Sequence, residues 1–256
     1  MLRNILAISK NTFRETIRDK ILLAAFVVIL TIILFTLFIA SVSLEQSTRM
    51  IVDFSVTAIY ILQIFVAIFM GSMLIYKEVE RKTFFLILPK PVRTSEVIIG
   101  KCLGLTLTTI LVSLISMCAL FAILFWKGEH GFYLLILLSL FLSTLESVLI
   151  ILISILFSGL TSPILSAVYT VAIYLVGHSA DVLRAIFIRS EEPFAQVVAK
   201  GAYYLFPNLE KFNIRNDIVY GIMPSTHLVL ITCVYAFCYG VVLFILAQLM
   251  FRKKDF

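Results

Sequence analysis

Apolar stretches of about 20 residues or more recur along this chain and leave little polar sequence from which to build a soluble surface. The chain is 61% hydrophobic and only 14% charged. A soluble protein could not bury that much apolar surface, so the composition predicts a polytopic membrane protein. The stretches do not alternate apolar and polar residues, which favours helices over the strands of a barrel. We therefore expect an all-α membrane protein whose residues 1–256 form a single transmembrane domain.

Lysine and arginine predict how the chain is oriented in the membrane. Fourteen of these residues fall in the two termini and the 77–101 insert, and seven fall in the remaining connections. Because cytoplasmic segments are enriched in Lys and Arg, both termini are expected in the cytoplasm, with the protein in the plasma (inner) membrane. This requires an even number of spans. The six predicted spans are residues 21–43, 54–76, 102–126, 133–158, 163–183 and 226–250.

Two segments outside the spans have amphipathic character. Within residues 1–20, the side chains of Leu2, Leu6 and Phe13 share one helical stripe, with basic residues beside it. Such a helix is expected to lie along the cytoplasmic lipid surface, although a merely solvated basic leader is the alternative. Residues 181–225 are too polar to span the bilayer, so we expect a long extracytoplasmic segment with amphipathic pieces.

The insert at residues 77–101 carries nine charges, six of them basic, so it cannot remain in lipid. Lys77–Arg81 would continue the second span out of the membrane. Phe84–Leu88 is a short apolar run bounded by charge, and Pro89–Pro91 ends any helix there. An exposed apolar run needs a cover. Either lipid headgroups or a partner protein would supply it.

The sequence lacks the residue sets that membrane enzymes use. It contains no H-E-x-x-H motif, so no metal site is expected. It also contains no phosphate-binding motif G-x-x-x-x-G-K-[ST], so the chain is not expected to bind ATP itself. The three histidines are separated in sequence, and the four cysteines form no C-x-x-C pair. We expect no catalytic residue, no bound cofactor and no nucleic-acid partner, and the chain would not be an enzyme by itself.

Polar residues inside the predicted spans are the candidates for an internal site. Glu146 is a carboxylate near the middle of a span, so it should face the protein interior and be paired or protonated. Serines line nearly one stripe of its helix, where small hydroxyl residues permit close helix packing. Packing and the lining of a substrate path are both open readings of these residues. The candidates are Gln63, Ser143, Glu146, Ser147 and Thr170.

Within and after the insert, the chain resembles the ABC type-2 permease family. The similarity lies in Glu80-Arg81-Lys82-Thr83, the apolar run to Leu88, Pro91-Val92-Arg93 and Ile99-Gly100-Lys101. Lys82 departs from the pattern, since the family more often has glycine before the threonine. The stretch Phe206–Gly221 is similar to the branch that includes the membrane subunit for maturation of nitrous-oxide reductase, a multicopper enzyme.

The resemblance implies a permease domain that works with separate subunits. Two permeases, identical or related, would pair with two ABC ATPase subunits that bind ATP and Mg, and drive export. The insert would supply a cytoplasmic coupling helix between the second and third spans. An ABC-type mechanotransmitter, which acts on an extracytoplasmic partner without moving solute, is the alternative. A membrane enzyme and an ion-coupled transporter fit the sequence less well. The expected ATPase-coupling residues are Glu78, Glu80, Arg81, Lys82, Thr83, Phe84, Phe85, Leu88, Pro91 and Arg93.

Overall fold

The computed structural model describes residues 2–42, 47–73, 93–129, 131–189 and 192–253, and in these ranges the chain forms helices and no strand. The predicted all-α class is therefore confirmed. The elements are α1 (Leu2–Ile17), α2 (Lys20–Val42), α3 (Ser47–Phe65), the π-helix η1 (Val66–Met70), α6 (Thr94–Trp126), α7 (Tyr133–Ser158), α8 (Pro163–His178), α9 (Ala180–Arg189), α10 (Pro193–Leu205), the 3₁₀ helix η2 (Glu210–Phe212), α11 (Arg215–Tyr220) and α12 (Thr226–Lys253).

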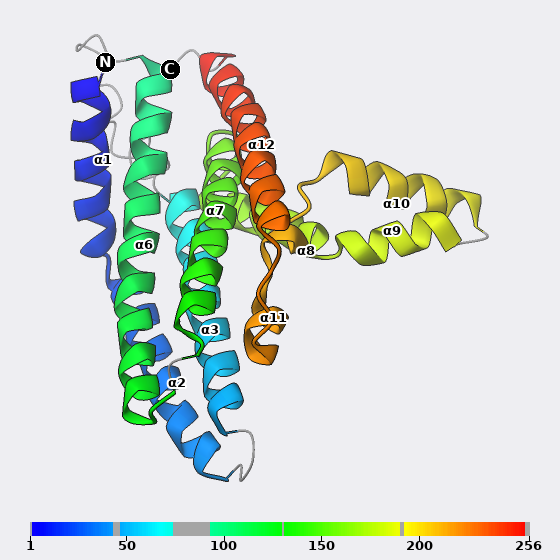
Figure 1. Ribbon diagram of the computed structural model, residues 1–256. Coiled ribbons are helices and arrows are strands. Elements are labelled where there is room, and N and C mark those ends of the chain that lie inside the picture. Colours follow the sequence, from blue (N-terminus) through cyan, green and yellow to red (C-terminus); the bar gives the residue numbers. More distant parts are fainter. Residues whose placement is uncertain (1, 43–46, 74–92, 130, 190–191, 254–256) are drawn as a thin grey trace.

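Long helices run lengthwise through the molecule, and the two chain ends lie at the same end of it (Figure 1). In the described part of the chain, five helices are long and apolar enough to cross a membrane: Lys20–Phe38, Ser47–Met73, Thr94–Trp126, Tyr133–Ser158 and Thr226–Phe251. The bent pair α8 and α9 provides a sixth candidate. The predicted polytopic membrane architecture is thus confirmed.

The core lies between α3, α6 and α7, where Leu62, Leu105 and Leu142 are almost completely buried. By contrast, α2 and α12 leave most of their apolar side chains exposed, Phe237 at 73% among them. Exposed apolar surface on this scale needs a cover. Lipid or another membrane protein would cover these helices.

Helix α6 begins well before the predicted third span. It starts at Thr94, eight residues ahead of the expected start at residue 102, and continues without a break to Trp126. At 1.5 Å per residue its 33 residues extend about 50 Å, whereas a bilayer hydrocarbon core is about 30 Å thick. A helix of this length extends beyond the hydrocarbon core, and the charged residues between Thr94 and Lys101 favour its first turns as the part that does so.

Helix α1 packs along the first half of α6 through a face of small residues (Figure 1). Its buried positions include Ser9, Thr12 and Thr16. Ser9 and Thr12 meet α6 at Gly104, and Ile5 and Ile8 meet it at Gly100. The predicted apolar stripe points elsewhere, and its first two leucines are largely exposed. The N-terminal segment forms the helix α1, and its position on the lipid surface stays a prediction.

We expect Gly104→Ala to loosen this contact. A Cβ atom at Gly104 would lie 2.6 Å from Thr12 Cβ and 2.7 Å from the Ser9 carbonyl oxygen. Because the second neighbour is backbone, α1 must shift, and overpacking of this kind typically costs about 1–3 kcal/mol. Thermal unfolding of the purified chain in detergent would measure the loss. Gly201→Ala is the matched control, because nothing lies within 4 Å of a Cβ there. Equal stability of the two variants would contradict the packing.

The predicted span at residues 163–183 is not one straight helix. α8 ends at His178, and α9 continues at an angle of 59°. Ser179 ends α8, since its backbone N–H and its hydroxyl both donate to the Leu175 carbonyl. After the bend, α9 and α10 form a hairpin that projects sideways from the long helices (Figure 1). The ring of Phe187 meets that of Tyr203 within this hairpin, with 5.5 Å between centroids.

Candidate functional site

Most of the predicted ATPase-coupling residues lie outside the described ranges. Arg93 is the exception: it is exposed and directly precedes the first turn of α6. The residues outside the described ranges are Glu78, Glu80, Arg81, Lys82, Thr83, Phe84, Phe85, Leu88 and Pro91.

Glu146 of α7 is fully buried and forms the centre of a polar cluster. Its Oε1 atom accepts a hydrogen bond from the Tyr60 hydroxyl of α3 at 2.6 Å. The same oxygen lies 2.8 Å from Nε2 of His178, the last residue of α8. Tyr60 Oη and His178 Nε2 are also 2.8 Å apart, so the three atoms form a triangle. Three helices thus converge on one carboxylate oxygen.

The imidazole of His178 joins this buried carboxylate to a second one nearer the surface. Its Nδ1 atom lies 2.9 Å from Oε2 of Glu210, whose side chain is 35% exposed. The other oxygen of Glu210 accepts a hydrogen bond from Asn213 Nδ2 at 2.9 Å. Glu210 belongs to η2, so His178 connects the long helices to the segment between α10 and α12. We refer to Glu146, His178 and Glu210 as the triad.

Two further groups border the triad. The Tyr174 hydroxyl donates to the Tyr60 hydroxyl at 3.3 Å. The Arg215 guanidinium lies over the Tyr60 ring, 4.5 Å from its centroid, where the ring face attracts a cation. Oε2 of Glu146 is buried and has no hydrogen-bond partner among the described residues. A buried polar atom left in this state raises the free energy of the fold.

Hydrogen bonds from backbone N–H groups hold the segment that carries Glu210 in place. The N–H of Leu209 donates to the Gly177 carbonyl at 3.1 Å, and the N–H of Asn208 donates to the Tyr235 hydroxyl at 2.7 Å. Glycine is required at position 177, because a Cβ there would lie 2.7 Å from the Pro207 carbonyl oxygen. The close approach of this segment to α8 places Glu210 beside His178.

Gln63 links three helices through its amide. Nε2 donates to Ser113 Oγ of α6 at 3.0 Å, and lies 3.4 Å from Thr144 Oγ1 of α7. The neighbouring predicted residues Ser143 and Ser147 bond to carbonyls of their own helix, at Leu140 and Thr144. These groups are buried. Packing and the lining of a path both stay predictions for these residues.

A second set of hydroxyls joins the end of the Ser47–Met73 span to α7 and α8. Ser166 donates to the Ser154 carbonyl at 3.1 Å and lies 3.2 Å from Ser72 Oγ, while Thr170 bonds back to the Ser166 carbonyl. Ser154 donates to the Ala67 carbonyl within η1, at 3.2 Å. π-helical turns leave carbonyls displaced from the regular ladder and are frequent at functional sites.

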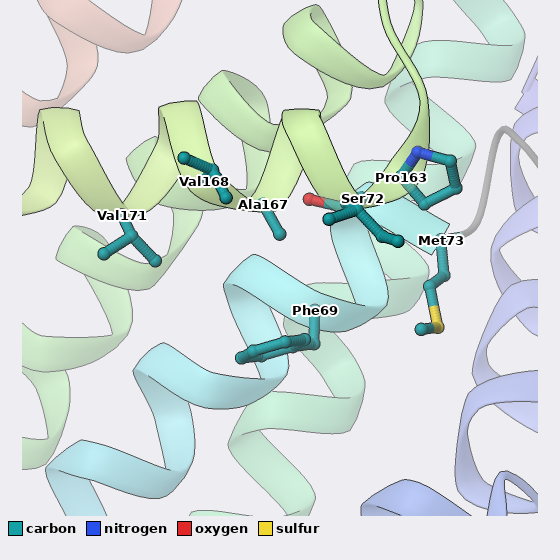
Figure 2. A pocket seen from close by; sticks show the side chains of 8 residues that line it. Phe69, Ser72, Met73, Pro163, Ala167, Val168 and Val171 are labelled. Atoms are coloured by element: carbon teal, nitrogen blue, oxygen red, sulfur yellow. The ribbon is translucent and has the colours of Figure 1, made fainter.

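An apolar cavity of about 290 Å³ opens beside these hydroxyls, between the end of the Ser47–Met73 span and the start of α8. Figure 2 shows Phe69, Ser72 and Met73 on one side and Pro163 and Ala167 among those on the other. Only an apolar group would fit such a lining. A larger apolar cavity, of about 540 Å³, lies between α7 and α12. The triad contributes to neither lining.

The hydropathy pattern identified Glu146 as an interior residue but did not identify its partners. The three histidines are separated in the sequence, and no pattern in it links His178 to Tyr60, Glu210 or Arg215. The available signal was physical: a carboxylate buried in a membrane helix needs a proton or a polar partner. His178, toward the end of the span predicted at residues 163–183, is the histidine that could act as this partner.

We expect Tyr60→Phe to destabilise the fold through the triad. The substitution removes the hydroxyl that donates to Glu146 Oε1 and leaves the ring in place. His178 Nε2 still lies 2.8 Å from that oxygen, so the cost is that of one lost hydrogen bond, typically about 0.5–1.5 kcal/mol. Unfolding in detergent, followed by circular dichroism, would measure it. Tyr220→Phe is the control, because Tyr220 is 67% exposed. If both variants unfold at the same temperature, the Tyr60 hydroxyl does not stabilise the fold.

Comparison with known families decides the class of protein. Residues 15–186, about two thirds of the chain, match the family described as ABC-2 family transporter protein. This chain belongs to that family. No curated protein gives a significant match to the chain. The predicted family is thereby confirmed, and the branch related to multicopper-enzyme maturation stays a prediction.

Membership in the ABC-2 family, together with the apolar helices, makes this chain a multi-pass membrane protein and a membrane subunit of an ABC transporter. Such a subunit pairs with an ABC ATPase, and the membrane component is generally not itself catalytic. The match extends from the second half of α1 into α9. It includes Tyr60, Glu146 and His178, whereas Glu210 lies beyond it.

Proposed function

We propose that this chain is the permease subunit of an ATP-driven exporter, in which it couples ATP hydrolysis by a separate ATPase subunit to substrate translocation. The observation that carries the proposal is the ABC-2 family match over residues 15–186. The 256 residues contain no phosphate-binding loop of their own, so ATP and Mg would bind to the partner. The chain would lie in the plasma membrane with both termini in the cytoplasm.

The 77–101 insert is the proposed point of contact with the ATPase. Its last residues belong to α6, which continues from Thr94 into the core as one helix. The base of the insert is firmly packed: Lys101 is 1% exposed, and Glu96 accepts a hydrogen bond from Asn4 of α1 at 3.0 Å. A rigid helix fixed in this way can carry a displacement from the insert to α3 and α7, which pack on α6.

A second permease, identical or related, would complete the transporter. The outward faces of α2 and α12 are long and apolar, and lipid alone would also cover them. The family pairing with an ATPase supports a dimer because the closure of two ATPase subunits would move two permeases. We therefore place the translocation path at an interface between permeases.

Isolation of the chain from its native membrane in mild detergent would test the proposal. The expected result is a complex with an ABC ATPase, in which Mg-ATP is hydrolysed and the rate depends on the permease. A chain that is abundant in the membrane yet isolates without any ATPase would contradict it. ATP hydrolysis without any solute movement would instead favour the mechanotransmitter.

A further inference from the structure

His178 lies between two carboxylates, and this arrangement sets the number of protons that the triad must hold. Nε2 is 2.8 Å from Glu146 Oε1, and Nδ1 is 2.9 Å from Glu210 Oε2. Each contact has hydrogen-bond length, so each needs a proton between its two atoms. A neutral imidazole carries one ring proton and an ionised carboxylate carries none. The triad in that state is therefore one proton short.

The Tyr60 hydroxyl does not supply the missing proton. If the imidazole proton is on Nε2, the Tyr60–Glu146–His178 triangle is satisfied, but the lone pair of Nδ1 faces Glu210. If the proton is on Nδ1, the triangle holds only the Tyr60 proton, and Nε2 faces the Glu146 carboxylate across 2.8 Å. Either tautomer leaves two lone pairs opposed at less than 3 Å.

The remaining polar groups around the triad are directed elsewhere. Tyr174 donates to Tyr60, and Arg215 donates through Nε to Asn213 Oδ1 at 3.0 Å while its guanidinium covers the Tyr60 ring. Lys211, next to Glu210, lies over the Tyr235 ring, 4.3 Å from its centroid. The positive charge of Arg215 offsets one carboxylate, and one additional proton brings the charges of the cluster into balance.

We propose that Glu146, His178 and Glu210 form a proton-binding site that fills and empties through Glu210 and that fastens the 206–221 segment to the membrane helices. Glu146 is fully buried, whereas the Glu210 side chain is 35% exposed, so the outer carboxylate is the place of exchange with solvent. His178 passes the proton inward, since each of its nitrogens faces one of the carboxylates. The ligand of this site is a proton.

Loss of the proton loosens the outer contact first. Glu146 and Tyr60 sit in the long helices α7 and α3 and are held by the core. Glu210 sits in a three-residue helix that is partly exposed. The opposed lone pairs are relieved most easily when η2 moves away from α8. Rising pH removes the proton, so the 206–221 segment is bound more tightly at low pH than at high pH, while its buried side chains and backbone contacts continue to hold it. This inference concerns contacts within the chain and does not depend on the proposed ATPase.

One substitution places a hydrogen-bond donor between His178 and residue 210 at every pH. In Glu210→Gln, the side-chain N–H replaces Oε2 and donates to Nδ1 of a neutral His178, whose Nε2–H then donates to Glu146. The amide oxygen still accepts from Asn213 Nδ2. This variant needs no additional proton, so the segment should stay fastened at every pH. Glu210→Ala removes the contact and should leave the segment less tightly bound at every pH.

Hydrogen–deuterium exchange of the full chain in lipid nanodiscs, from about pH 5 to about pH 9, tests the site. The readout is the protection of amides in residues 206–221, corrected for the intrinsic effect of pH on exchange. The wild-type chain should lose about tenfold in protection as the pH rises. Glu210→Gln should keep the low-pH protection throughout, and Glu210→Ala should lack it throughout.

A charge-matched control is available in Glu129→Gln, which neutralises an exposed carboxylate between α6 and α7. It should follow the wild-type pH profile. Protection in the wild-type chain that does not change with pH would overturn the proposal. It would equally be overturned by a Glu210→Gln chain that keeps the wild-type pH dependence or that exchanges as fast as Glu210→Ala.

Discussion

Glu146→Ala is expected to lower the free energy of unfolding by about 3–5 kcal/mol, the typical cost when one partner of a buried charged contact is removed. The substitution leaves the Tyr60 hydroxyl and His178 Nε2 without the oxygen that both contact. It also opens a cavity at a fully buried position in α7. Reversible denaturant unfolding of the purified chain in detergent would measure the change.

Two variants show whether that loss comes from the buried contacts. Glu146→Gln keeps an acceptor for Tyr60 and should lose much less stability than Glu146→Ala. Glu129→Ala removes a carboxylate from an exposed connection and should leave stability nearly unchanged. If Glu146→Ala unfolds like Glu129→Ala, then the cluster does not stabilise the fold.

Phe85→Asp is expected to abolish association with the ATPase, and this prediction rests on the proposed function. Phe84–Leu88 is the apolar run that we assign to a groove on the partner, and an aspartate there would have to be desolvated on docking. Pull-down of the ATPase with tagged permease should fall at least about tenfold, which corresponds to about 1.4 kcal/mol of binding free energy. Membrane insertion should be unaffected.

The matched control is Phe85→Leu, which keeps an apolar side chain and should retain the ATPase. Glu80→Ala, in the charged part of the insert, should also reduce association or uncouple hydrolysis from transport. Full ATPase association and full activity in both Phe85→Asp and Glu80→Ala would show that the insert is not the coupling element.

Hydropathy predicted the membrane helices well because their signal is local. The expected span at residues 133–158 has the same bounds as α7. Helix α6 begins at Thr94, where Thr94 or Ser95 can cap a helix and Glu96 lies in its first turn, whereas the apolar span was expected only from residue 102. In the fold, α1 covers these turns, and Lys101 is 1% exposed. The charged turns ahead of the apolar span are thus covered by a tertiary contact that the sequence does not show.

The candidate site was only half predictable for a similar reason. The cost of a buried carboxylate places Glu146 in the interior, and this follows from its position in the sequence. Its connection to Glu210 runs through His178, and each of those carboxylates is 32 residues from the histidine. The contact of Pro207 and Leu209 with Gly177 brings Glu210 to His178, and an apolar run across residues 163–183 gives no sign of it. The π-helix at Val66–Met70 likewise has no recognisable sequence signal.

ATP-driven movement of solute in sealed vesicles is the most direct test of the central claim, that this ABC-2 family protein is the permease of an exporter. The permease and its co-purified ATPase would be reconstituted with the ATPase facing outward and supplied with the compound isolated alongside them. The account predicts that the compound accumulates in the vesicles only when Mg-ATP, the ATPase and the permease are all present. Accumulation that persists without the ATPase, or ATP hydrolysis with no accumulation, would contradict it.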